Sequence, residues 1–142
     1  PFMNVYSGDK RIRIEHGHLY DPFFVNHPEL YELATSIAGG FLRVSPSLYK
    51  AWIGYETLRN RLLTHFRRGG GDVLADEHPV FSEAARVLLR RGFDAVVFGH
   101  THVPGTLRVD KQKVYCNAGS WMIRGNYVAI ENGEVELCQW RH

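Results

Sequence analysis

Two hydrophobic periods along the 142-residue chain predict its first elements. From Lys10 to Glu15, charged residues alternate with Ile12 and Ile14, which is the period of a half-buried strand. Over about residues 28–68, apolar residues recur every three or four positions and predict helix. The second part of this segment carries one apolar stripe, formed by Leu48, Trp52, Tyr55, Leu58, Leu62 and Phe66. We expect this stripe to pack in a core, as apolar stripes at helical spacing usually do.

The second half of the chain predicts a helix followed by a buried strand. From Pro79 to Arg91 the apolar residues share one helical face, and Gly92 stands where a left-handed cap is expected. Residues 93–98 form an unbroken apolar run, which is typical of a strand buried on both faces of a parallel sheet. Short strands that we expect to be antiparallel follow at 106–109, 114–117, 127–131 and 134–140, with turns at Asp110-Lys111 and Asn132-Gly133.

These elements predict one α/β core interrupted by a helical insert. The core consists of residues 10–21 and 79–140, and the insert covers about 28–71. The insert ends at the triplet Gly69-Gly70-Gly71, because consecutive glycines stop a helix and form a flexible joint. We therefore treat residues 1–142 as one domain, or a large part of one.

Composition narrows the class of protein. Hydrophobic residues make up 44% and charged residues 23% of the chain, as in ordinary globular proteins. The net charge is only +2 and basic runs do not exceed two residues, so we expect no nucleic-acid partner. Cys116 and Cys138 are too few for a disulfide scaffold. The sequence lacks an apolar run of the roughly 20 residues that cross a bilayer, which favours the cytoplasm.

Four histidines occur in two H-x-H pairs, and each pair follows a predicted strand. His16 and His18 follow the first strand, and His100 and His102 follow the buried one. Ligands of open α/β sheets bind where the carboxyl ends of strands meet, and residues i and i+2 of extended backbone face the same side. Because neutral imidazole commonly binds transition metals, the pattern predicts a metal site. We expect Gly17 and Gly99 to let the backbone turn sharply there.

Three motifs resemble signatures of the calcineurin-like metallophosphoesterase superfamily. Residues 98–104 (FGHTHVP) resemble its last signature, and residues 15–18 (EHGH) resemble the histidine signature before it. Residues 117–121 (NAGSW) are similar to a loop that often follows in bacterial members. The resemblance implies the C-terminal half of a four-layer α/β/β/α sandwich with a helical insert. It also implies metal-dependent hydrolysis of a phosphoric ester or pyrophosphate bond.

The resemblance further implies a centre of two divalent transition-metal ions, such as Mn, Fe or Zn. His16 and His100 would bind one ion and His102 the other. Two neighbouring cations neutralise a phosphate and activate a water molecule. His18 stands where several relatives carry Asp, so we expect it beside the ligands or facing the substrate.

The family's first three signatures are D-x-H, G-D-x-x-D and G-N-H-[DE], and this sequence has none of them. Gly8-Asp9 lacks a second Asp at the required spacing. We therefore expect the chain alone to be inactive and to need a missing N-terminal half or another copy of itself. The opening Pro1-Phe2-Met3 agrees equally well with a chain cut from something longer and with a start at Met3 that leaves residues before it.

The helical insert resembles the lid of bacterial UDP-2,3-diacylglucosamine hydrolases. That resemblance implies a phosphorylated or pyrophosphate-containing substrate and a peripheral contact with the inner membrane. Lys50, Arg59 or Arg61 would meet phosphate, and the aromatic residues of the stripe would line an acyl pocket, although core packing explains the stripe more simply. Asp72, Asp76, Glu77 and His78 precede the later helix and could add metal ligands, although helix capping is the simpler role for the acidic ones. We expect His27, His65 and His142 at the surface.

Two alternatives remain open at this point. In the first, the chain is a non-catalytic module that binds one metal through His16, His100 and His102. In the second, it is a structural module that binds no metal and assembles through an exposed sheet.

Overall fold

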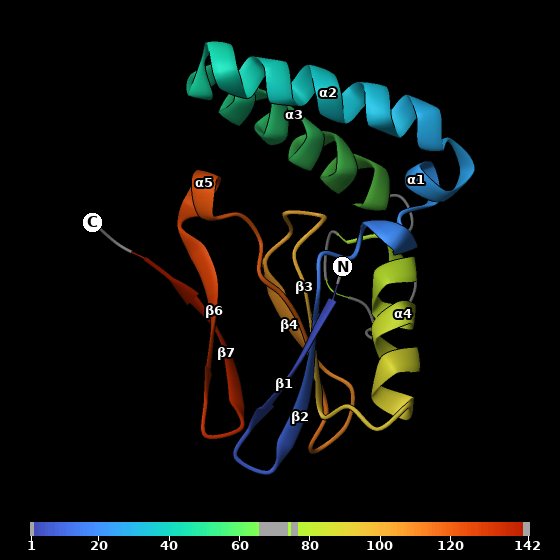
Figure 1. Ribbon diagram of the computed structural model, residues 1–142, viewed down its shortest axis with the longest axis vertical. Helices are drawn as coiled ribbons and strands as arrows, with labels where there is room; N and C mark the ends of the chain where they lie inside the picture. The colour runs from blue at the N-terminus through green and yellow to red at the C-terminus, as the bar shows by residue number, and fades with distance from the viewer. Residues whose placement is uncertain (1, 66–73, 75–76, 141–142) are drawn as a thin grey trace.

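The computed structural model describes residues 2–65, 74 and 77–140 and shows a mixed α/β protein (Figure 1). In the first half of the chain the elements are β1 (Phe2–Ser7), β2 (Lys10–Glu15), a short 3-10 helix η1 (His18–Tyr20), α1 (Pro22–Asn26), α2 (Pro28–Val44) and α3 (Pro46–His65). In the second half they are α4 (Pro79–Arg90), β3 (Ala95–Phe98), β4 (Gly105–Arg108), β5 (Val114–Asn117), α5 (Trp121–Arg124), β6 (Asn126–Glu131) and β7 (Glu134–Gln139). The α/β class expected from the sequence is confirmed.

Five strands form the main sheet, in the order β1-β2-β3-β5-β4. The three central strands are parallel, while β1 and β4 pair antiparallel at the two edges. The expectation that residues 114–117 are purely antiparallel is wrong, because Ala95 pairs with Val114 and Phe98 with Asn117 in parallel register. The carboxyl ends of β2, β3 and β5 therefore lie side by side at one edge of the sheet.

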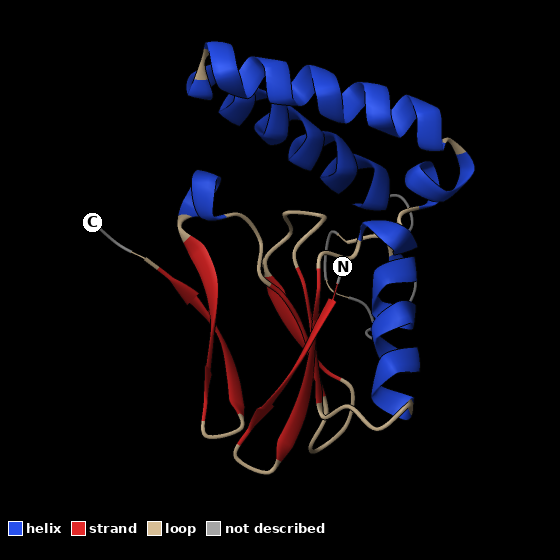
Figure 2. Ribbon diagram, in the orientation of Figure 1, coloured by secondary structure: helices blue, strands red, loops and turns tan. Residues whose placement is uncertain are grey.

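Helix α4 lies against one face of this sheet and the β6–β7 hairpin against the other (Figure 2). All four residues of β3 are buried, which confirms the prediction of a doubly covered strand. Val96 and Phe98 pack with α4 on one face. Ala95 and Val97 pack on the other face against side chains of the β6–β7 hairpin. The order of layers is thus helix, five-stranded sheet and two-stranded sheet.

Local signals define the ends of several elements. Helix α4 ends before Gly92, which has φ 92, so the predicted left-handed cap is confirmed. Asn132 and Gly133 both have positive φ, 49 and 84, as a tight turn between β6 and β7 requires.

The insert is an antiparallel helical pair, α2 and α3, beyond the carboxyl edge of the sheet (Figure 1). The helical segment breaks at Ser45-Pro46, because proline cannot continue a helix and restricts the residue before it. No helix in the described ranges has the length and apolar character needed to cross a membrane.

The predicted core role of the apolar stripe on α3 is wrong. Leu48, Trp52, Tyr55 and Leu58 are 52%, 39%, 61% and 56% exposed, whereas Ile53, from outside the stripe, is buried. The period predicted the helix correctly, but the described chain provides no layer that covers this face. Of the other members of the stripe, Phe66 lies outside the described residues and Leu62 outside the described side chains.

Candidate metal centre

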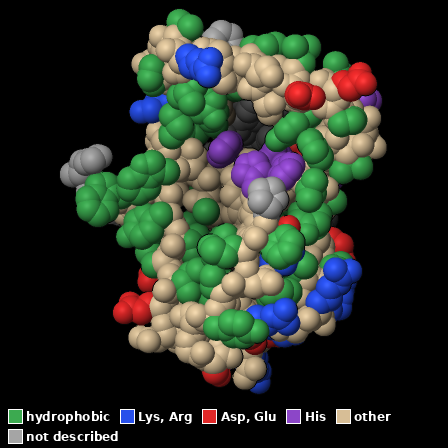
Figure 3. All heavy atoms as spheres, in the orientation of Figure 1, with side chains coloured by type: hydrophobic (Ala, Val, Ile, Leu, Met, Phe, Trp, Pro, Cys, Tyr) green, Lys and Arg blue, Asp and Glu red, His purple; other side chains and the backbone are tan. Residues whose placement is uncertain are grey.

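Three of the four motif histidines converge at the carboxyl edge of the sheet. The ring centroids of His16 and His100 lie 4.9 Å apart, those of His16 and His18 5.2 Å, and those of His18 and His100 6.4 Å. The Gly99 amide donates to the His16 carbonyl at 3.2 Å, which ties the ends of β2 and β3 together. Figure 3 shows histidine side chains gathered at a hollow beneath the helical pair.

The two motif glycines differ in what they contribute. Gly17 has φ 96, and a Cβ there would lie 3.4 Å from Cβ and Cγ of Phe98, so the expected need for glycine is confirmed. Gly99 has no left-handed φ, and a Cβ would meet open space. The chain does turn directly after β3, at His100 and Thr101, but nothing in the backbone of Gly99 requires glycine there.

His16 and His18 are in direct contact. Their Nδ1 atoms are 3.2 Å apart, so one ring donates a hydrogen bond and the other accepts it. Partial burial, followed by the charges of His100, His18 and His102, lowers the pKa of His16 to about 4. Desolvation and His100 also lower the pKa of His18. Both rings are therefore neutral at pH 7, which is the form that binds metal ions.

Asp21 is a site residue that the sequence analysis did not single out. Its Oδ2 lies 2.7 Å from Nε2 of His100, and its Oδ1 accepts from the Phe23 amide at 2.8 Å as the N-cap of α1. Although burial raises the pKa of Asp21, hydrogen bonds from His100 and Phe23 outweigh it, so the pKa falls below its ordinary value. The Asp-Pro cap signature was the available signal, but it does not predict a histidine partner 79 residues away.

Helices α1 and α2 also contribute aromatic rings to the histidines. The Phe24 ring lies 5.0 Å from that of His18, and the Tyr31 ring lies 6.1 Å from that of His100. Helix α1 and the start of α2 therefore form one wall of the candidate centre.

His102 differs from the other three in its backbone and surroundings. It has φ 57, a left-handed conformation that is costly for a residue with a Cβ. Its Nδ1 is buried and has no hydrogen-bond partner among the described residues. Burial lowers its pKa, while a backbone hydrogen bond with Gly119 opposes the change. A buried, neutral nitrogen without a partner suits a metal ion or another electrophilic ligand.

The predicted ligand set is brought together only in part. His16 and His100 are neighbours, and His102 is near enough for its charge to lower the pKa of His16. Among the described residues, however, no group of three or more His, Cys, Asp or Glu side chains is arranged to hold a metal ion. The assignment of His16, His100 and His102 as ligands stays a prediction.

Glu77 does not have the capping role that the sequence suggested. The N-cap of α4 is His78, whose Nδ1 accepts from the Val80 amide at 3.3 Å. Glu77 is instead 2% exposed and accepts hydrogen bonds from Thr101, Tyr115 and Asn117. Burial raises its pKa, although these hydrogen bonds oppose the shift. Asp72 and Asp76 lie outside the described residues.

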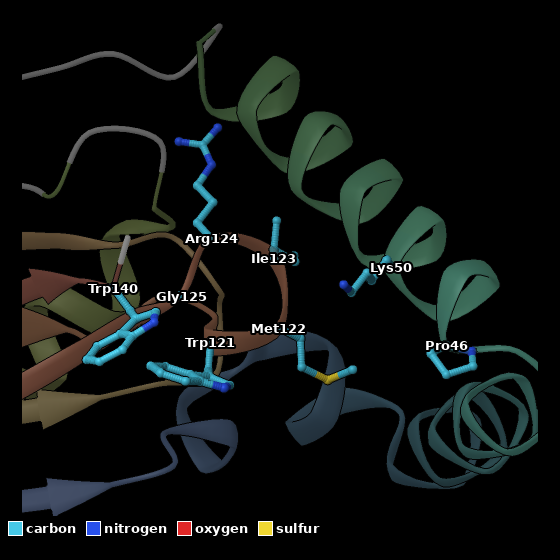
Figure 4. A pocket seen from close by; sticks show the side chains of 8 residues that line it. All are labelled: Pro46, Lys50, Trp121, Met122, Ile123, Arg124, Gly125 and Trp140. Atoms are coloured by element: carbon cyan, nitrogen blue, oxygen red, sulfur yellow. The ribbon is translucent and has the colours of Figure 1, made fainter. Parts of the chain in front are cut away.

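A groove of about 620 Å³ lies between α3 and α5. It is lined by Pro46, Lys50, Trp121, Met122, Ile123, Arg124, Gly125 and Trp140. Lys50 extends from α3 toward α5, and the two tryptophans lie together on the α5 side (Figure 4). Of the three basic residues expected to meet phosphate, Lys50 lines this groove, and Arg59 and Arg61 lie outside the described side chains.

The remaining histidines fall outside this arrangement. His27 is exposed, as expected, and its ring contacts that of Phe23 at 5.9 Å between centroids. His65 and His142 lie outside the described side chains.

The chain matches no protein-family model, and no curated protein is significantly similar to it. The resemblance of three motifs to metallophosphoesterase signatures therefore stays a prediction, and the proposal below depends on the site itself.

Proposed function

We propose that this chain forms the histidine side of a divalent-metal centre in a hydrolase of phosphoric esters or pyrophosphates. The observation that carries the proposal is the convergence of His16, His18 and His100 at the carboxyl ends of adjacent parallel strands. Ligand sites of α/β sheets form at this edge.

The chemistry of the donor atoms fits a divalent transition metal. The lowered pKa values of His16 and His102 keep both rings neutral, with lone pairs available. Asp21 stands behind His100, the arrangement in which a carboxylate holds one ring nitrogen protonated and leaves the other free for a ligand. A bound divalent ion would supply positive charge against a phosphoryl group and make a water molecule more acidic.

The ligand count supports a centre that is shared with other polypeptide. Three imidazoles without a bridging carboxylate cannot hold two adjacent cations. We propose that the remaining ligands come from an N-terminal half or from another copy of the chain, and that this chain alone does not turn over substrate.

The order of the layers supports the four-layer α/β/β/α sandwich that the motifs imply. In an α/β/β/α sandwich, two sheets pack face to face between two helical layers. Helix α4, the main sheet and the β6–β7 hairpin would be three of these layers in order. The partner polypeptide would extend the two-stranded sheet and cover it with the fourth layer.

The groove between α3 and α5 favours an amphiphilic phosphate or pyrophosphate as substrate. Lys50 and Arg124 offer positive charge, and Trp121, Met122 and Ile123 offer apolar surface. We propose that the protein lies in the cytoplasm. A substrate with a lipid part would bring it into peripheral contact with the inner membrane.

Metal titration of the isolated chain tests the proposal. We expect Co²⁺, Mn²⁺ or Zn²⁺ to bind, and His16→Ala and His100→Ala each to weaken binding by about 10–100-fold, as the loss of a ligand or its support does. His27→Ala, at an exposed histidine outside the cluster, is the matched control and should bind as the parent does. Equal binding by all four proteins would contradict the proposal, as would hydrolysis of bis-p-nitrophenyl phosphate by the chain alone.

A further inference from the structure

We propose that Glu77 is a positioning residue that holds the two loops carrying His102 and Gly119 in place. The inference rests on the proposed function, because it assigns a purpose to the geometry of the candidate metal centre. Thr101, Tyr115 and Asn117 are its partners, and together with Glu77 they are called the Glu77 network below.

One carboxylate oxygen of Glu77 receives the bonds from both loops. The hydroxyl of Thr101 donates to Oε1 at 2.8 Å, and Nδ2 of Asn117 donates to the same atom at 2.7 Å. Thr101 lies between His100 and His102 in the loop after β3, and Asn117 ends β5. The other oxygen, Oε2, receives the Tyr115 hydroxyl at 2.9 Å, and that hydroxyl also lies 2.9 Å from Oε1.

Asn117 extends the Glu77 network to the second loop. Its Nδ2 also donates to the Thr101 hydroxyl at 2.8 Å, and its Oδ1 accepts from the Gly119 amide at 2.9 Å. Gly119 has φ 69, and a Cβ there would lie 2.6 Å from Cβ of Pro104, so this loop packs closely on the segment that follows His102. The backbone of Gly119 also bonds to His102. Glu77 thus acts on the His102 loop along two paths.

A mere filler of the core would not explain a carboxylate at this position. Glu77 is 2% exposed, and its three partners are neutral side chains. Burial of a carboxylate is unfavourable, and an apolar side chain would pack at lower cost. What the carboxylate adds is the capacity to accept several hydrogen bonds at once. That capacity fixes Thr101 and Asn117, and with them the left-handed backbone of His102.

Four variants separate positioning from simple stability. Glu77→Gln keeps Oε1 as the acceptor for Thr101 and Asn117, and its amide replaces Oε2, whose partner Tyr115 can accept. Glu77→Leu removes every acceptor at similar size, and Thr101→Val removes the hydroxyl that donates to Glu77 and accepts from Asn117, whose Oδ1 holds the Gly119 amide. Tyr115→Phe is the matched control, because it removes bonds to the same carboxylate from a strand instead of a loop.

The first measurement is amide hydrogen exchange at Gly119 in the metal-free chain. We expect Glu77→Leu and Thr101→Val to speed exchange by about tenfold or more, and Glu77→Gln and Tyr115→Phe to change it only as far as global stability changes. This result does not depend on a metal. If the parent chain binds no Co²⁺, the proposed function fails, and exchange at Gly119 still decides the role of Glu77.

The second measurement is Co²⁺ binding, followed by the visible spectrum of the bound ion. We expect affinity to fall by about 10–100-fold and the spectrum to change for Glu77→Leu and Thr101→Val, with Glu77→Gln and Tyr115→Phe within about threefold of the parent. Parent-like exchange and Co²⁺ binding in Glu77→Leu would overturn the inference. If Glu77→Leu fails to fold, parent-like values for Thr101→Val would overturn it instead.

Discussion

The strand-end histidines and the helical insert are neighbours in space, but they are stabilised in different ways. Around the histidines, buried side chains from both sides of the sheet hold β2, β3 and β5 in place, and hydrogen bonds join the strand ends. Along α2 and α3, Ile53 is the one buried side chain among those described. Large apolar side chains such as Leu33, Ile37 and Tyr55 are instead exposed.

This difference separates the core, which contacts within the chain hold in place, from the insert, whose apolar side chains those contacts leave exposed. The candidate centre stands on a sheet that has a cluster of buried apolar side chains on each face. Asp21 and Phe24, just before the insert, and Tyr31, in its first turns, contact that centre, and many of the described apolar side chains farther along α2 and α3 are exposed, as at an interaction surface. We expect the core to tolerate substitution poorly and the insert to tolerate it well.

The same substitution made in both regions should give the largest contrast. Leu89, on α4, is 1% exposed, and Leu33, on α2, is 58% exposed. We expect Leu89→Ala to lower the free energy of unfolding by about 2–5 kcal/mol, because it leaves a cavity in the core. Leu33→Ala should change it by no more than about 0.5 kcal/mol, as exposed substitutions usually do. Urea denaturation measures both, and a similar loss in the two variants would show that the insert is packed as firmly as the core.

The two motif glycines give a smaller contrast, within the core itself. We expect Gly17→Ala to destabilise the chain by about 1–2 kcal/mol, because a Cβ is unfavourable at φ 96 and presses on Phe98. Gly99→Ala should stay within about 0.5 kcal/mol of the parent, since a Cβ there meets open space. Thermal unfolding at matched pH compares them. If Gly99→Ala proved the more damaging, the backbone assignment of the two loops would be wrong.

Local patterns in the sequence predicted many of the elements. The period of two predicted β2, the unbroken apolar run predicted β3, and the cap signals placed the end of α4 and the turn between β6 and β7. These signals act over a few residues, so the sequence alone displays them. The break at Pro46 had its own local signal in the proline, but the apolar period through both helices obscured it.

What could not be predicted depends on contacts between distant residues. The parallel pairing of β5 is set by its partner β3, which the pattern of β5 does not reveal. Glu77 is bonded to side chains 24, 38 and 40 residues away, so its local position before a helix suggested a cap. The stripe on α3 shows which face is apolar, but not what covers that face. The metal assignment itself stays a prediction, because the described side chains alone do not complete a ligand set.

The smallest effect on stability should come with a clear effect on assembly. Leu33→Lys combined with Leu58→Lys places charges on the exposed apolar faces of α2 and α3. We expect little change in the unfolding temperature, because neither side chain is buried in the described chain. If another copy or a partner half covers these faces, the charges must be desolvated on association, so the mass measured by light scattering should fall toward that of one chain.

Ser36→Lys with Ser47→Lys adds the same charge at exposed polar positions of the two helices and should leave the mass unchanged. A parent chain that is already monomeric at high concentration would show that the insert does not mediate self-association. The exposed apolar faces of α2 and α3 would then have to be covered by a different partner.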